Sequence, residues 1–115
     1  TFEPGDVVLV RFPFTDLTAA KKRPALVIST IDFSRRFKDV ILIALTSQPQ
    51  EETDLLLQDW RAAGLPKVTW LKPLIATVAN DLVDRRLGSI SAADRLKVRT
   101  LLYRVIAPLF DQQPQ

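Results

Sequence analysis

The sequence predicts a mainly β domain, a small antiparallel barrel or sandwich, with one helix at its C-terminal end. Short apolar runs bounded by turn residues fill the first half of the chain, and no helical periodicity separates them. Apolar residues recur at helical spacing only near the C-terminal end. The 115 residues suit one domain. We therefore expect residues 1–110 to form a single domain and residues 111–115 to form a polar, flexible tail.

Three strands are predicted in the N-terminal half. Residues 7–10 are a β-branched and leucine run that Arg11 and Phe12 extend, and the runs at residues 24–29 and 40–45 have the same character. Each run is short, apolar and bounded by turn residues. This pattern is typical of buried strands, and the absence of helical segments between the runs argues against alternating βαβ units.

The middle of the chain permits two interpretations, a strand at residues 55–57 or one helical turn at residues 59–63 before Gly64. Beyond it, residues 67–71 alternate in a strand pattern that Pro73 is expected to end, because proline cannot donate to a ladder. Residues 74–78 predict a further short strand.

The final helix is predicted from its start signal and its periodicity. Ser91 and Asp94 have the spacing of a capping box. Apolar residues then recur at helical intervals at Val98, Leu101, Leu102, Val105 and Leu109. Pro108 and the polar tail are expected to end the domain.

Composition excludes several kinds of chemistry. The chain has no Cys and no His, which removes disulfides, thiolate nucleophiles, the usual general base and the commonest metal ligands. Its 3 Gly leave no material for a phosphate-cradling loop. The acidic residues worth weighing as metal ligands form two groups, Glu51, Glu52 and Asp54, and Asp81 with Asp84. Both groups are better explained as solvated charges, so we expect no metal and no cofactor.

The net charge of +3 and the pI near 9.6 permit an anionic partner without demanding one. No apolar run approaches the roughly 20 residues that a membrane span needs, and residues 1–6 lack the features of a signal peptide. We therefore expect a cytoplasmic location and no membrane partner.

Four short motifs along the chain are informative in combination. Residues 4–17 are PGDVVLVRFPFTDL, residues 21–29 are KKRPALVIS, residues 43–48 are IALTSQ, and residues 87–91 are LGSIS. Together with the Thr53-Asp54 and Gly64-Leu65 pairs, they resemble the MazF/PemK-like family of toxin endoribonucleases of type II toxin–antitoxin systems. The resemblance covers nearly the whole domain.

The resemblance implies an SH3-like β-barrel of the MazF/PemK/CcdB type that acts as a homodimer. It also implies an mRNA interferase, which cleaves single-stranded RNA at specific sequences without the ribosome and is inhibited by a cognate antitoxin. Because the chain lacks metal ligands, we expect this endoribonuclease to be metal-independent. Two alternatives remain open. One is a non-catalytic SH3-like module that binds RNA or a peptide, and the other is a gyrase-poisoning toxin of the same fold.

The resemblance places the catalytic residues at Arg23 and Thr46, with Ser47 assisting. An arginine fork can bind two phosphate oxygens and stabilise growing negative charge, and a hydroxyl can donate to a phosphate oxygen. Asp16 is a candidate acid or base in the first loop. The chain has Thr18 where some relatives carry an acidic residue, and Trp70 and Lys72 where others carry Arg and Asp.

The candidate RNA-binding residues are basic or aromatic side chains that follow the first loop or lie near the ends of strands. They are Phe14, Lys21, Lys22, Arg35, Arg36, Lys38, Trp70 and Lys72. Because the chain offers no obvious metal site, we expect the adjacent 2′-OH of the RNA to attack the phosphorus, with Arg23 and Thr46 stabilising the transition state.

Overall fold

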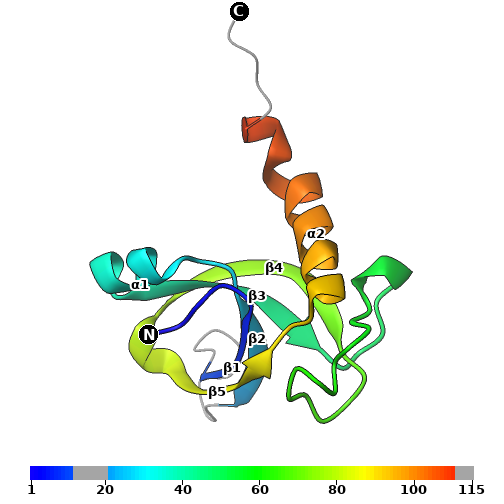
Figure 1. Cartoon of the computed structure of the whole chain (residues 1–115), viewed down its shortest axis with the longest axis horizontal. Helices are drawn as coiled ribbons and strands as arrows, with labels where there is room; N and C mark the ends of the chain where they lie inside the picture. The colour runs from blue at the N-terminus through cyan, green and yellow to red at the C-terminus, as the bar shows by residue number, and fades with distance from the viewer. Residues whose placement is uncertain (12–20, 111–115) are drawn as a thin grey trace, which may run out of the picture.

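A computed structural model describes residues 1–11 and 21–110 of the chain, and the fold is one curled antiparallel sheet with helices at its margins (Figure 1). The sheet has five strands in the order β4-β3-β2-β1-β5. In chain order, the elements are β1 (Asp6–Arg11), β2 (Lys22–Val27), α1 (Ile31–Phe37), β3 (Asp39–Thr46), η1 (Thr53–Leu55), β4 (Trp70–Ala79), η2 (Asn80–Leu82), β5 (Val83–Ser89) and α2 (Ala92–Phe110).

Two apolar clusters form because alternate residues of a strand point to opposite faces of the sheet. In β1, Val7 joins the first cluster, whereas Val8 and Val10 join the second. The first cluster also takes in Val98 and Leu101 of α2 and the buried leucines of the segment that follows η1. The sheet is thus covered on one face by α2 and that segment.

The structure confirms a mainly β domain with a C-terminal helix, and it confirms the first three strands within about two residues at each end. The start of α2 is also confirmed, since the Ser91 hydroxyl oxygen accepts the backbone N–H of Asp94 at 3.2 Å. The helix includes Pro108 and ends at Phe110, one residue beyond Leu109, the last residue of the predicted periodicity. No helix in residues 1–11 and 21–110 is long and apolar enough to cross a membrane.

The prediction that Pro73 ends a strand was wrong. β4 runs through Pro73 as one strand, and its pairing with β3 is irregular between Ile43 and Leu45, directly beside the proline. Proline has no backbone N–H to donate to a neighbouring strand. Because β4 is an edge strand and Pro73 lies at a bulge, the sheet needs no hydrogen bond from this position.

Two elements longer than a single turn were not predicted from the sequence, α1 and β5. The helix α1 has only 7 residues, although it carries ordinary signals: the Thr30 hydroxyl oxygen accepts the N–H of Phe33 at 3.1 Å, and the rings of Phe33 and Phe37 lie 5.0 Å apart. The strand β5 is mostly exposed and carries Asp84, Arg85 and Arg86, so it lacks the apolar pattern by which the other strands were found.

The middle segment follows neither interpretation fully. It begins with η1, and Leu56 then makes an isolated bridge to Trp70. From residue 58 to 64 the backbone forms turns, with the N–H of Ala63 donating to the carbonyl of Asp59 at 3.1 Å. Of the two interpretations of this segment, a helical turn at residues 59–63 is closer to the structure than a strand at residues 55–57.

Candidate functional site

A groove of about 720 Å³ lies where β2 begins and β3 ends. One part of its lining comes from β2 and from the end of β3 with the residues after it, and the other part comes from β4 and the segment that precedes β4. The lining residues include Arg23, Thr46, Ser47 and Gln48 in the first part, and Leu65, Lys67, Thr69 and Lys72 in the second. The groove therefore joins three motifs that are far apart in the sequence.

Arg23 and Thr46 are brought together by the register of β2 and β3. The paired residues are Ala25 with Ala44, Leu26 with Ile43, and Val27 with Leu42. Continuing this antiparallel register by two residues places Arg23 opposite Thr46, on the same face of the sheet. Pro24 favours extended backbone at Arg23, which fits its place inside β2.

The Thr46 hydroxyl has a defined orientation. Its oxygen accepts the backbone N–H of Gln48 at 3.1 Å in a local turn. Because a hydroxyl carries one proton and two lone pairs, this contact leaves the proton available as a donor toward the groove. Ser47 follows on the exposed rim. The same threonine thus makes a structural turn and presents a hydrogen-bond donor.

The electrostatic character of the groove is positive. Arg23, Lys67 and Lys72 line it, and no Asp or Glu is among its lining residues within the described ranges. None of these three cations makes an ion pair with another residue in the part of the chain that the structure describes. Lys22, by contrast, pairs with Asp84 at 3.2 Å. A groove with this lining has the charge to attract an anion.

The other candidate residues are distributed unevenly. Lys21 is exposed just before β2 and outside the groove, and Trp70 packs against the first apolar cluster. The basic residues of α1 and its C-cap come just before the start of β3, whereas the groove lies at the far end of that strand. Because β3 has 8 residues, its two ends lie roughly 23 Å apart. The basic residues placed there are Arg35, Arg36 and Lys38. Phe14 and Asp16 lie outside the described residues.

Sequence reasoning missed Lys67 as a groove residue. It was taken only as the start of a predicted strand, but the strand begins at Trp70 and Lys67 belongs to the preceding segment. No local pattern distinguishes this lysine from an ordinary surface lysine. Its position depends on how the segment folds back on the first apolar cluster through Leu57, Ala63 and Leu65.

Metal-ligating residues do not gather in the described ranges, where no group of three or more acidic side chains is placed to hold a metal ion. Asp84, one of the acidic residues considered from the sequence, is paired with Lys22. Glu52 and Asp54 are paired with Arg104 at 3.4 and 2.7 Å.

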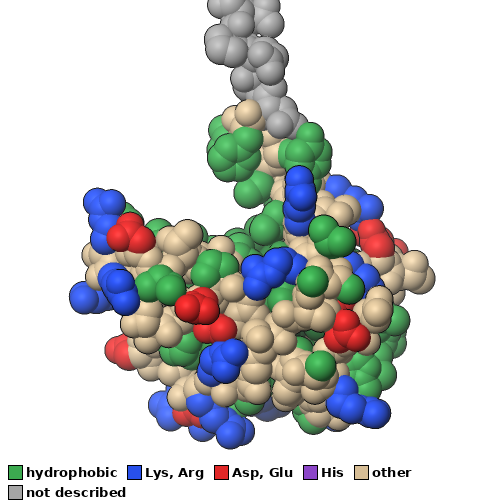
Figure 2. Space-filling model, viewed as in Figure 1, with side chains coloured by type: hydrophobic (Ala, Val, Ile, Leu, Met, Phe, Trp, Pro, Cys, Tyr) green, Lys and Arg blue, Asp and Glu red, His purple; other side chains and the backbone are tan. Residues whose placement is uncertain are grey.

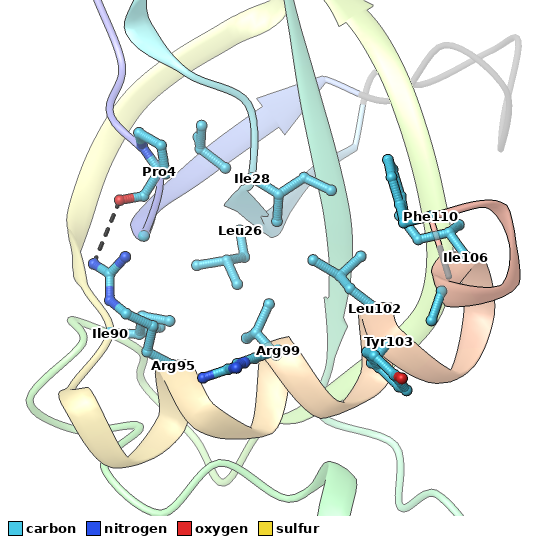
Figure 3. A pocket seen from close by; sticks show the side chains of 14 residues that line it. Pro4, Leu26, Ile28, Ile90, Arg95, Arg99, Leu102, Tyr103, Ile106 and Phe110 are labelled. Atoms are coloured by element: carbon cyan, nitrogen blue, oxygen red, sulfur yellow. Dashed lines mark hydrogen bonds between the residues drawn. The ribbon is translucent and has the colours of Figure 1, made fainter. Parts of the chain in front are cut away.

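A second hollow lies between α2 and β2 and is mostly apolar (Figure 3). It has a volume of about 370 Å³. Leu26 and Ile28 face it from the sheet side, and Leu102 and Ile106 face it from the helix. The only charged groups among its described lining residues are Arg95 and Arg99 of α2. This surface is unlike the groove and suits an apolar partner more than RNA.

Comparison with known proteins gives a family and a fold. Residues 3–106 match the family model described as PemK-like, MazF-like toxin of type II toxin–antitoxin system. Comparison with curated protein sequences finds no match.

Three solved structures illustrate the likeness of fold. An endoribonuclease in complex with its cognate antitoxin, from a Mycobacterial species, has 21% identity and a TM-score of 0.66, with 92% of this chain and 93% of that chain covered. The Mycobacterium tuberculosis toxin MazF-mt6 has 12% identity and a TM-score of 0.72, covering 89% and 96%. A MazE-MazF structure from Deinococcus radiodurans has 16% identity and a TM-score of 0.74, covering 92% and 96%.

At these identities the solved structures show a common fold. The family match also shows the family, because it spans about nine tenths of the sequence and includes the segments that bear Arg23 and Thr46. The chain therefore belongs to the PemK-like, MazF-like toxins of type II toxin–antitoxin systems.

Proposed function

We propose that this chain is an endoribonuclease toxin that cleaves single-stranded RNA in the groove between β3 and the segment preceding β4. The observation that carries the proposal is that Arg23 and Thr46 line one positively charged groove, in a chain of the MazF-like toxin family. Solved structures with the same fold include proteins named endoribonucleases, which supports the same activity here.

Arg23 acts on the charge of the reacting phosphate. Its guanidinium can donate two parallel hydrogen bonds to non-bridging oxygens, and it stays protonated at any physiological pH. Negative charge on those oxygens grows as a fifth oxygen approaches phosphorus, so a fixed cation stabilises the transition state more than the ground state.

The nucleophile is the 2′-OH of the RNA itself. Its oxygen forms a bond to phosphorus, the bond from phosphorus to the 5′-oxygen breaks, and the products are a 2′,3′-cyclic phosphate and a 5′-OH. The proton lost by the 2′-OH is balanced by the proton that the leaving 5′-oxygen gains. The Thr46 hydroxyl donates a hydrogen bond to a phosphate oxygen, keeps its proton, and helps to hold the nucleophile in line. This step needs no metal-bound water.

A homodimer is supported by the second half of α2, which projects away from the sheet (Figure 1). Figure 2 shows hydrophobic side chains gathered over this projecting end. The most exposed are Leu109 at 77% and Phe110 at 73%. Exposed apolar side chains gathered in this way are costly in water, so we propose that a second copy of the chain covers them.

A cognate antitoxin is the second partner that we propose. The groove is basic and free of carboxylates among its described lining residues, so an acidic, flexible segment that folds on binding would mask it. One solved structure of the same fold holds its toxin with a cognate antitoxin. We place this pair in the cytoplasm, where the RNA substrate is made and translated.

Incubation of the purified chain with long single-stranded RNA, in EDTA, tests the proposed function. We expect discrete fragments with 2′,3′-cyclic phosphate ends, and we expect Arg23→Ala to slow cleavage by about 10² to 10³. Asp84→Asn is the control, because Asp84 lies on β5 and pairs with Lys22 outside the groove. An Arg23→Ala variant that cleaves like the natural chain would contradict the mechanism. Intact RNA together with gyrase-dependent breaks in plasmid DNA would favour a gyrase poison instead.

A further inference from the structure

One wall of the groove is a closed loop, residues 57–69, which we call the wall loop. The backbone N–H of Leu57 donates to the carbonyl of Thr69 at 3.0 Å, which joins the two ends of the loop. The Thr69 hydroxyl, on a side chain only 3% exposed, donates to the carbonyl of Lys67 at 2.7 Å. The backbone that carries Lys67 is therefore fastened directly to the base of the loop.

Asp94 of α2 holds the start of the wall loop. Its side chain is fully buried, and its two carboxylate oxygens accept the backbone N–H groups of Gln58 at 2.8 Å and Asp59 at 2.9 Å. The Lys97 ammonium, one turn further along α2, donates to the carbonyl of Leu56 at 2.5 Å. Because a buried carboxylate without partners is very costly, these two N–H groups are strongly constrained to stay beside Asp94.

Ser91 and Asp94 form only half of the capping box that their spacing predicts. Ser91 caps the N–H of Asp94, which is the ordinary half of the motif. The Asp94 carboxylate instead reaches another element, since it caps the turn that begins at Asp59. This residue therefore contributes to the groove wall as well as to its own helix.

Lys67 has the features of a phosphate-binding residue. It is exposed, lines the groove, and makes no ion pair within the described ranges. Arg23 and Thr46 occupy the sheet side of the groove, and Lys67 occupies the loop side. An RNA strand that places its reacting phosphate at Arg23 would bring a different phosphate toward Lys67, because successive phosphates of a strand lie several ångströms apart.

We propose, building on the RNA-cleaving function above, that Lys67 binds a backbone phosphate beside the reacting one. Asp94 is the positioning residue that holds Lys67 in the groove through the wall loop. Lys67 therefore contributes to affinity and to its salt dependence, whereas Arg23 and Thr46 contribute to the chemical step.

The test of Lys67 uses the full chain and an RNA oligonucleotide that carries a cleavage site mapped with the natural chain. A 2′-O-methyl group at the cut position blocks cleavage, so that Kd can be measured. We expect Lys67→Ala to raise Kd severalfold, to leave kcat unchanged with the cleavable RNA, and to reduce the slope of log K against log salt by about 0.7. Arg61→Ala is the matched control, since Arg61 is in the same loop but stacks on Trp60, 4.9 Å from its ring, outside the groove.

The test of Asp94 is a double-mutant cycle with Lys67. We expect Asp94→Asn to raise Kd in the natural chain and to have no further effect on Kd in the Lys67→Ala background. A general loss of folding would add to the effect of Lys67→Ala instead, so thermal unfolding is measured alongside. If Asp94→Asn does not fold, Lys97→Met removes the other helix contact to the start of the loop and takes its place in the same cycle.

The outcomes separate this inference from the proposed function. Cleavage by the natural chain, with Kd and salt slope unchanged in Lys67→Ala, would overturn the role of Lys67 alone. Additive effects in the cycle would overturn the positioning role of Asp94. If the natural chain neither binds nor cleaves RNA, the proposed function fails and this inference fails with it.

Discussion

Arg23 of β2 and Thr46 of β3 line the same groove, two residues beyond the last β2–β3 pair, Ala25 with Ala44, so the two groups that we assign to catalysis are held on neighbouring strands instead of on loops. Their separation is set by strand spacing and by the register that Ala25 and Ala44 define. A slip of one residue would send one of them to the opposite face of the sheet. The apolar clusters on both faces make such a slip very unfavourable, and this keeps the site in place.

Removal of the Thr46 hydroxyl should slow cleavage while leaving the fold intact. Thr46→Val keeps the shape of the side chain but loses the donor to phosphate and the acceptor for the Gln48 N–H. Since a hydrogen bond to a charged group contributes about 1.5–3 kcal/mol, we expect kcat to fall roughly 10- to 100-fold. Single-turnover cleavage of the mapped RNA measures this change.

Two further variants define what that result means. Thr46→Ser keeps the hydroxyl and should recover most of the rate. Thr77→Val removes a hydroxyl from β4 outside the groove and should leave the rate unchanged. Equal rates for Thr46→Val and the natural chain would show that the hydroxyl takes no part in the reaction.

Lys72 should contribute to RNA affinity through charge alone. It lines the groove with Arg23 and Lys67 and makes no ion pair among the described residues. Three cations that each neutralise one phosphate of a single strand give a slope of log K against log salt near −2. We expect Lys72→Ala to reduce that slope by about 0.7, measured by RNA binding at several salt concentrations. A slope that stays the same would place Lys72 outside the RNA path.

The sequence allowed prediction of β1, β2, β3 and α2 because each carries its own apolar pattern. It failed at β5, where an exposed edge strand is stabilised by pairing with β1 and by ion pairs such as Arg86 with Asp6. It failed at Pro73 because the bulge that accommodates the proline is a property of two strands together. Local patterns do not contain information of this kind.

The same distinction applies to the groove. Arg23 and Thr46 came from a resemblance of motifs, and the structure brings them to one place. Lys67 belongs to none of these motifs. Its position depends on contacts of the wall loop with Asp94, which lies many residues later in the chain. Arg35 and Arg36 had the expected charge, but α1 places them at the other end of β3.

Gly64 should be intolerant of any side chain. Its φ is +85°, in the left-handed region, and a Cβ added there would lie 2.2 Å from the carbonyl oxygen of Leu87. Left-handed strain and overpacking together predict that Gly64→Ala lowers the free energy of unfolding by about 2–4 kcal/mol. Urea unfolding measures this change. Ala62→Gly, at an exposed position of the same turn, should cost 1 kcal/mol or less, and equal losses in the two variants would argue against the steric explanation.

The projecting half of α2 should control assembly. Leu109 and Val105 are 77% and 50% exposed, and a proposed second copy would cover them. Leu109→Glu and Val105→Glu leave the chain's own core untouched but place a charge in the contact, so we expect each to weaken the dimer at least tenfold. Sedimentation velocity at a series of protein concentrations measures the change.

Thr100→Glu is the matched control for this surface. Thr100 is exposed and lies nine residues before Leu109, which places it on the opposite side of the helix at 3.6 residues per turn. We therefore expect it to leave the dimer unchanged, with a thermal midpoint close to that of the natural chain. If all three glutamate variants weaken the dimer equally, net charge is responsible and the apolar face is not the interface. A natural chain that sediments as a monomer at micromolar concentration would contradict the homodimer itself.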